Sequence, residues 1–186
     1  MTRLKFVFVL VFSLMLASSS TALASGGKTQ PWSYDPNGLN CGTGAWVTHE
    51  GLPDAGKSNH ALVVTKECPT SSEAAGGATV SGFSGQTLTS LGFDIRDDSY
   101  CGAGAPRFNV STTDGVTHFF GCVYGVHSPA ASGWTHVAFA PGDAFPPVGP
   151  SDIIDAIEIV MDEEGTAVLD NIEVNGVVMG KPGNAK

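Results

Sequence analysis

The stretch that decides the fold covers residues 153–174 and reads IIDAIEIVMDEEGTAVLDNIEV. Aliphatic side chains recur at alternate positions on both sides of a polar segment, 162–165, which ends in glycine. A period of two is typical of half-buried β-strands, and a short polar segment between two such runs indicates a turn. We therefore predict two adjacent strands joined as a β-hairpin. The alternating apolar residues are Ile157, Ile159, Met161, Val168, Ile172 and Val174.

Asp170 is the unexpected residue of this stretch. Alternation places its carboxylate on the same side of the strand as Ile172 and Val174, the side that should face the core. A buried carboxylate is costly unless it is paired, hydrogen-bonded or bound to a metal ion. Two interpretations stay open. Asp170 is a ligand of a structural calcium ion together with loop carbonyls, or it is held by backbone N–H groups, by Arg96 or by Arg107.

Residues 1–24 have the features of a secretory signal peptide. Arg3 and Lys5 precede an apolar run at residues 6–16, and the small residues 22–24 provide a cleavage site. The apolar run is too short to span a bilayer, which takes about 20 residues. We expect a secreted protein, extracellular or periplasmic, with no membrane insertion.

Charge excludes some classes of partner. Without residues 1–24 the chain keeps seven basic residues against 18 acidic ones, a net charge of −11. Nucleic acids and anionic membranes are bound by clustered Lys and Arg, so neither is expected as a partner. Such a chain suits solubility, cations or neutral ligands, and we expect a monomer.

Four cysteines predict two disulfides in an oxidising compartment. None of them forms the C-x-x-C pair of a zinc site. Three pairings are conceivable, and neighbours along the chain are the most natural partners in a meander of strands. We predict Cys41–Cys68 and Cys101–Cys122, each closing a short loop worth roughly 3 kcal/mol.

Turn residues recur every eight to twelve positions or so, and no helical period extends over a useful window. This spacing predicts an all-β fold, an antiparallel, jelly-roll-like β-sandwich of about nine short strands. Asp114-Gly115 is a hairpin signal that should pair residues 107–111 with 117–124. The domain is expected at residues 41–180. A flexible arm at 25–40 should precede it, and a polar tail at 181–186 should follow.

Catalytic motifs are not evident, and we predict a protein that is not an enzyme. The five histidines show no ligand spacing such as H-x-x-x-H. His118 and His136 lie on predicted strands and could meet in space with an acid, which keeps a hydrolase or lyase as a third hypothesis. Asn109 begins a glycosylation sequon whose use depends on the host.

The ending AVLDNIEVNG, preceded by GWTHVAF, resembles the last strands of jelly-roll carbohydrate-binding modules and related galactose-binding-like sandwiches. In those modules an aspartate before Asn and an aliphatic residue often helps to hold a structural calcium ion, so the resemblance implies a calcium role for Asp170. The stretch from CGAGAPRFNV to HFFGC is similar to exported bacterial proteins of unassigned function.

Sugar binding requires exposed aromatic faces together with polar groups. Tyr100 and Tyr124 flank the predicted Cys101–Cys122 disulfide, so they should share one end of the sandwich. We predict that they bind the ligand of a secreted, non-catalytic module, and that this ligand is an extracellular polysaccharide. The alternative is a secreted structural or protein-interaction domain without a small ligand.

Overall fold

The computed structural model describes residues 26–54 and 58–180. The expected signal peptide and polar tail lie outside the described residues. Within them the fold is all-β, and its helical turns are two single 3-10 turns, η1 (Cys122–Tyr124) and η2 (Pro141–Asp143). No helix among the described residues has the length and apolar character needed to cross a membrane. The twelve strands are β1 (Lys28–Tyr34), β2 (Gly42–Val47), β3 (Ala61–Lys66), β4 (Ala75–Ser81), β5 (Leu91–Arg96), β6 (Arg107–Thr112), β7 (Thr117–Gly121), β8 (Val126–Ala131), β9 (Trp134–Phe139), β10 (Ile154–Met161), β11 (Gly165–Val174) and β12 (Val177–Met179).

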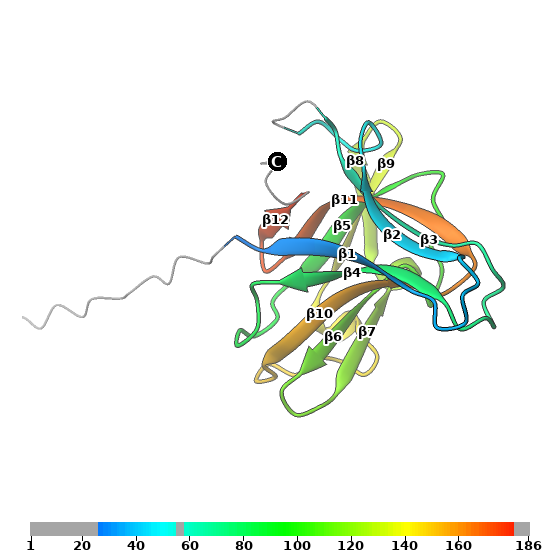
Figure 1. The fold of residues 1–186 in the computed structure, drawn as a ribbon. Coiled ribbons are helices and arrows are strands. Elements are labelled where there is room, and N and C mark those ends of the chain that lie inside the picture. The colour runs from blue at the N-terminus through cyan, green and yellow to red at the C-terminus, as the bar shows by residue number, and fades with distance from the viewer. Residues whose placement is uncertain (1–25, 55–57, 181–186) are drawn as a thin grey trace, which may run out of the picture.

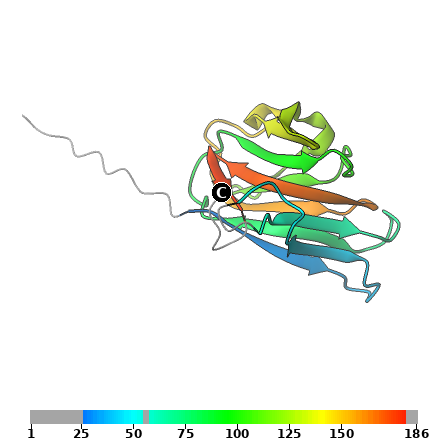
Figure 2. The same ribbon diagram turned by 90° about the horizontal axis from the view of Figure 1, so that it is seen from above.

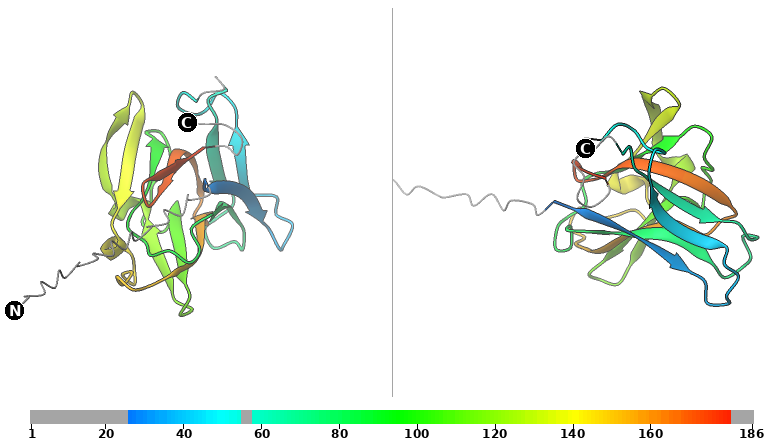
Figure 3. Two further views of the ribbon diagram at one scale, coloured as in Figure 1. Left: turned by 90° about the vertical axis from the view of Figure 1, so that its left-hand side faces the viewer. Right: turned by 45° about the horizontal axis from the view of Figure 1, so that its top comes forward.

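The strands form two antiparallel sheets that pack as a sandwich (Figure 1). One sheet has five strands in the order β1-β4-β10-β6-β7. The other has seven, in the order β2-β3-β11-β5-β9-β8 with β12 attached to β11. In the left panel of Figure 3 the β8–β9 pair and the β2–β3 pair lie at opposite sides of the molecule. The predicted sandwich is confirmed, with more strands than the nine expected.

The predicted hairpin at residues 153–174 is wrong. Its two strands exist as β10 and β11, but β10 pairs with β4 and β6, whereas β11 pairs with β3, β5 and β12. The polar segment therefore carries the chain from one sheet to the other. The aliphatic side chains of both strands face the core. They are buried between the two sheets, just as they would be if β10 and β11 were neighbours in one sheet. Alternation reports burial of one face, not the identity of the neighbouring strand.

The core fills the space between the sheets. Its centre is a group of aromatic rings on β5, β6, β7 and β9 with centroids 5.5–6.1 Å apart, and most of these contacts are edge-on. Aliphatic side chains of β10 and β11 pack around this group. The central rings belong to Phe93, Phe108, Phe120 and Phe139.

Asp170 lies on the other face of β11 from the one predicted. Asn171 has a left-handed backbone (φ 44°), and the pairing of β11 with β5 shifts between Asp170 and Glu173. This irregularity breaks the alternation, because an extra residue in one strand changes the face of the residues beyond it. Ile172 and Val174 face the core, while Asp170 pairs with Asp94 on the outer face.

The fold begins earlier in the chain than predicted. Residues 28–34 of the expected flexible arm form β1, which pairs with β4 along its whole length. Figure 2 shows β1 beginning beside β12, so both ends of the described chain lie at one end of the sandwich. The disulfides Cys41–Cys68 and Cys101–Cys122 are confirmed. The hairpin of β6 and β7 is also confirmed.

Candidate functional site

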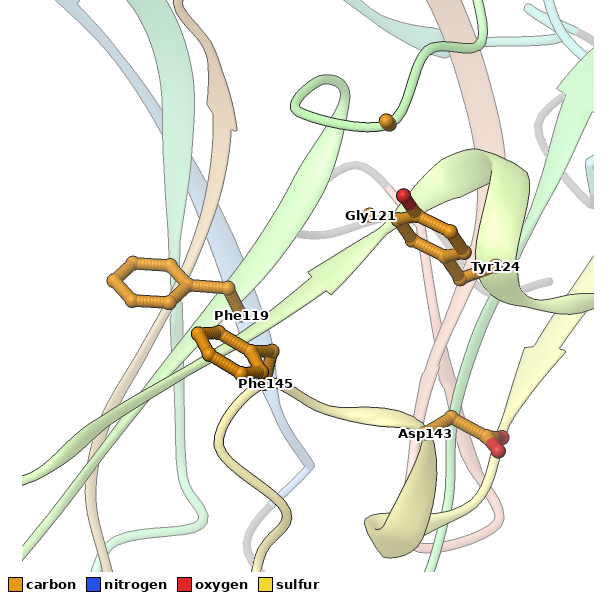
Figure 4. Close-up of a pocket in the computed structure, with 6 residues that line it drawn as sticks. Phe119, Gly121, Tyr124, Asp143 and Phe145 are labelled. Atoms are coloured by element: carbon orange, nitrogen blue, oxygen red, sulfur yellow. The ribbon is translucent and has the colours of Figure 1, made fainter.

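A hollow of about 530 Å³ lies at the outer edge of the five-stranded sheet, beside β7. Aromatic side chains from three separate segments contribute to it. Figure 4 shows Phe119 and Phe145 close together, with the ring of Tyr124 on another side and Asp143 below it. The lining residues are Ala103, Phe119, Gly121, Tyr124, Asp143 and Phe145.

The alternation of β7 exposes Phe119. His118 and Phe120 are buried, so the ring between them must point outwards, and it is 40% exposed. The connection after η2 then runs along this edge. Phe119 and Phe145 exchange two backbone hydrogen bonds of 3.0 Å, which fixes the two rings next to each other although 26 residues separate them in sequence. Phe145 is 81% exposed.

Tyr124 reaches the hollow from η1, directly after β7. The residue is 66% exposed. The turn is held by the Cys101–Cys122 disulfide and by a hydrogen bond of 3.2 Å from the N–H of Val123 to the carbonyl of Gly102. Gly121 permits this close approach, since a Cβ atom there would collide with the carbonyl of Ala103. The tyrosine is thus presented by a rigid turn.

The charged groups near the hollow are mostly engaged. Asp143 accepts a hydrogen bond of 2.7 Å from the backbone N–H of Ala140, which caps η2. The guanidinium of Arg107 lies 5.6 Å from the centre of the Phe119 ring and supports it from the side. Arg107 also makes hydrogen bonds to both carboxylate oxygens of Asp162, at 2.5 and 2.8 Å. Its positive charge is therefore already neutralised.

Tyr100, the second tyrosine predicted to bind ligand, is not among the residues that line this hollow. Its hydroxyl donates a hydrogen bond of 2.7 Å to Glu163. This hydrogen bond and the adjacent negative charge raise the pKa of Tyr100. Its ring is partly exposed. Ligand binding by Tyr100 and Tyr124 stays a prediction, and the geometry favours Tyr124.

The contacts of Asp170 bear on the calcium prediction. The side chain is fully buried. One oxygen accepts the N–H of Leu52 and the other accepts the N–H of Asn171, both at 2.7 Å. Backbone donors aimed at a carboxylate favour the hydrogen-bonded interpretation, because a calcium ion would compete with them for the same oxygens. Calcium binding at Asp170 stays a prediction.

His118 and His136 do not converge. They lie on different sheets, His118 in the interior and His136 on the outer face of the seven-stranded sheet. The ring nitrogens of His118 bond the carbonyl of Pro146 at 2.8 Å and the hydroxyl of Thr112 at 3.2 Å, with Asp152 at 3.9 Å. His118 is therefore a satisfied structural residue. His136 instead makes a hydrogen bond of 2.7 Å with Asp94.

Within the described ranges, one group of three His, Cys, Asp or Glu side chains has its ligand atoms within 4.8 Å of one another: Cys101, Cys122 and His127. Its two sulfurs form a disulfide and offer no thiolate.

Phe119 and Phe145 were not identified from the sequence. A signal existed for Phe119, because two consecutive phenylalanines on one strand must point to opposite faces. For Phe145, in the proline-rich connection AFPP, no sequence pattern indicates that it returns to the edge of β7.

No family model matches the sequence, and no curated protein matches it significantly. Solved structures do match. The family 11 carbohydrate-binding module of the cellulosomal cellulase Lic26A-Cel5E of Clostridium thermocellum superposes with a TM-score of 0.50 at 15% identity, covering 80% of this chain and 88% of that chain. A family 11 module from the same organism, in complex with a β-1,3-1,4-mixed-linked tetrasaccharide, superposes with a TM-score of 0.47 at 14% identity. This match covers 87% of this chain and 94% of that chain. A β-1,2-glucanase from Parabacteroides distasonis gives 0.46 at 14% identity, over 80% of this chain and 22% of that one. The predicted resemblance to carbohydrate-binding modules is confirmed at the level of the fold.

Proposed function

We propose that this chain is a secreted, non-catalytic module that binds a neutral polysaccharide in the aromatic hollow beside β7. One observation carries the proposal: Phe119, Tyr124 and Phe145 expose their rings around a single hollow of about 530 Å³. Sugar rings present C–H faces that pack against aromatic rings, while a phenol hydroxyl supplies hydrogen bonds to sugar hydroxyls.

Charge selects among polysaccharides. The described residues that line the hollow include Asp143 and no basic side chain, and the nearby Arg107 is paired with Asp162. A polyanionic glycan would bring carboxylates or sulfates to an acidic protein without a cationic partner. A neutral chain meets no such penalty, so we assign the site to neutral glycans.

Sequence features typical of secretion, the disulfides and the fold support the proposal. The signal-like residues 1–24 and the two disulfides suit an oxidising, extracytoplasmic compartment. The module with the TM-score of 0.50 comes from a cellulosomal cellulase, and its fold provides the same kind of scaffold.

The test is binding to a panel of glycans, by affinity electrophoresis and calorimetry. The panel contains β-1,3-1,4-glucan, β-1,2-glucan and xylan, with polygalacturonate as the anionic member. Phe145→Ala should weaken binding by roughly 10-fold, because losing the burial of a large ring costs about 1.5 kcal/mol or more. Tyr34→Ala removes an exposed aromatic residue of β1 and should leave binding unchanged. Equal losses in the two variants, or preference for polygalacturonate, would contradict the proposed site.

A protein-binding role is the second candidate, favoured by one observation. Val123 and Val126, 50% and 68% exposed, are neighbours of Tyr124 in sequence and add exposed apolar side chains to this segment. A contiguous apolar surface is typical of protein interfaces. If no glycan binds while Phe145→Ala and Val126→Ser both abolish binding to one purified partner, this role replaces the first.

A further inference from the structure

A second hollow, of about 420 Å³, lies on the outer face of the seven-stranded sheet, away from the aromatic hollow. It is built by β5, β9, β11 and β12, and its polar groups come from neighbouring strands. The lining residues are Asp94, His136, Asn171, Glu173 and Val178.

The centre of this hollow is an oriented histidine. The Asp94 carboxylate, whose side chain is 9% exposed, accepts a hydrogen bond of 2.7 Å from Nδ1 of His136. Its other oxygen accepts Nδ2 of Asn171, also at 2.7 Å. Because a carboxylate can only accept, the proton of neutral His136 must sit on Nδ1. The lone pair is then on Nε2, which makes no hydrogen bond with the described residues, and the ring is 32% exposed.

Gly92 forms the floor between His136 and Glu173. It pairs with Glu173 on one side and with Ala138 on the other, in the row of residues next to Asp94 and His136. A Cβ atom at this position would lie 3.3 Å from Cε1 and 3.5 Å from Nε2 of His136. Glycine inside a strand weakens it and often marks a close approach to a ligand. Here it leaves the Nε2 edge of the ring clear.

The polar atoms around this floor are hydrogen-bond acceptors. They are Nε2 of His136, the carboxylate of Glu173 and Oδ1 of Asn171, whose amide nitrogen is already used. Such a group of acceptor atoms is suited to bind a cation. Imidazole nitrogen favours zinc, copper and nickel, whereas calcium prefers oxygen ligands alone.

We propose that this hollow binds a divalent transition-metal ion of the zinc class, through Nε2 of His136 and the carboxylate of Glu173. Asp94 is the positioning residue, since a carboxylate on the second ring nitrogen fixes the tautomer and raises the basicity of a metal-binding histidine. Glu173 accepts a hydrogen bond of 3.3 Å from Ser90, so binding requires its carboxylate to turn from Ser90 towards Gly92. Asn171 and water complete the coordination.

The test is a Zn²⁺ titration of the folded protein, followed by the imidazole Hε1 signals in NMR and by calorimetry. The His136 signal should respond at lower Zn²⁺ concentration than the signal of His49, an exposed histidine outside the hollow. His136→Gln should abolish the calorimetric binding, and His49→Asn should leave it unchanged. Responses of both histidines at the same concentration would mean adventitious binding only and would overturn the proposal.

Asp94 and Glu173 need separate variants. Asp94→Asn should weaken Zn²⁺ binding by about 10- to 100-fold and change the ¹⁵N shifts that report the His136 tautomer. Because Asp94 is buried, the melting temperature of the Asp94→Asn variant must be measured as well. Glu173→Gln, on the partly exposed rim, should weaken binding without a change in tautomer. Zn²⁺ affinity that is unaffected in both variants would refute the site even if His136 responds. Glycan binding should be intact in all these variants, so this test and that of the proposed function fail independently.

Discussion

Oδ2 of Asp170 accepts a hydrogen bond of 2.7 Å from the backbone N–H of Leu52, which lies 118 residues earlier in the chain. This contact ties the segment after β2 to the middle of β11. Leu52 also packs against Ala61, Val168 and Trp134, a small cluster on the outer face of the seven-stranded sheet. The Asp170 carboxylate thus holds the segment around Leu52 against the outer face of the sheet.

Asp170→Ala should destabilise the fold by about 3 kcal/mol, because it leaves two partly buried backbone N–H groups without their acceptor. For a domain of this size that is roughly 6–12 °C in melting temperature. Asp155→Ala, a change at an exposed aspartate of β10, should shift the melting temperature little. A loss for Asp170→Ala no larger than for Asp155→Ala would show that these hydrogen bonds contribute nothing to stability.

The calcium prediction is decided by the same variant. A folded-state ligand raises the melting temperature, so removal of a bound calcium ion must lower it. If the N–H bonds of Leu52 and Asn171 are the whole role of Asp170, a chelator leaves the wild-type melt unchanged. A chelator effect present in wild type and missing in Asp170→Ala would establish the ion.

The Asp54 carboxyl should make the stability of the fold depend on pH. Its hydrogen bond with His60, at 3.0 Å, holds the pKa of the Asp54 carboxyl far below its ordinary value of 3.8, and backbone donors assist. A lowered pKa means that the ionised form stabilises the fold above pH 3.8, and that this contribution disappears as the pH falls towards the folded-state pKa. Asp54→Asn should therefore melt below wild type from pH 7 down to pH 4 or so, and the gap should close in stronger acid. A gap that widens in acid would contradict this assignment.

Lys66 should be among the most sensitive positions. Its ammonium group is buried and donates to the carbonyls of Thr70, Ser72 and Asp162, at 2.9, 2.7 and 2.8 Å. Lys66→Met keeps the apolar stem but leaves three carbonyls without a donor, at a cost of about 3 kcal/mol. Urea denaturation of this variant and of Lys28→Met, an exposed lysine on β1, measures the difference. Equal midpoints would mean that water replaces the ammonium at no cost.

The two tyrosines predicted to bind ligand can be separated. Under the proposed function, Tyr124→Ala should weaken glycan binding several-fold, since its ring lines the aromatic hollow. Tyr100→Phe removes the hydroxyl that bonds Glu163 and should leave the affinity within a factor of about two, as expected of a change outside the hollow. Calorimetry with the best glycan of the panel measures both. A larger loss for Tyr100→Phe would move the binding surface to the Glu163 side of the disulfide.

The sequence by itself determined the all-β class, the inward faces of β5, β6 and β10, and the hairpin of β6 and β7. It favoured the two disulfide pairings that the structure contains. These follow from local rules: a period of two reports which side is buried, Asp-Gly sets a turn, and short loops bring neighbouring cysteines together. Tertiary structure decided which strand lies beside which, so β10 and β11 separated into different sheets although their alternation suggested a hairpin. It also decided the face of Asp170, because one left-handed residue, Asn171, changes the register beyond it. Both hollows arise from such long-range pairing: Phe145 meets Phe119, and His136 meets Asp94, only when distant strands become neighbours. Their contacts depend on the packing of the whole sandwich, which no local pattern encodes.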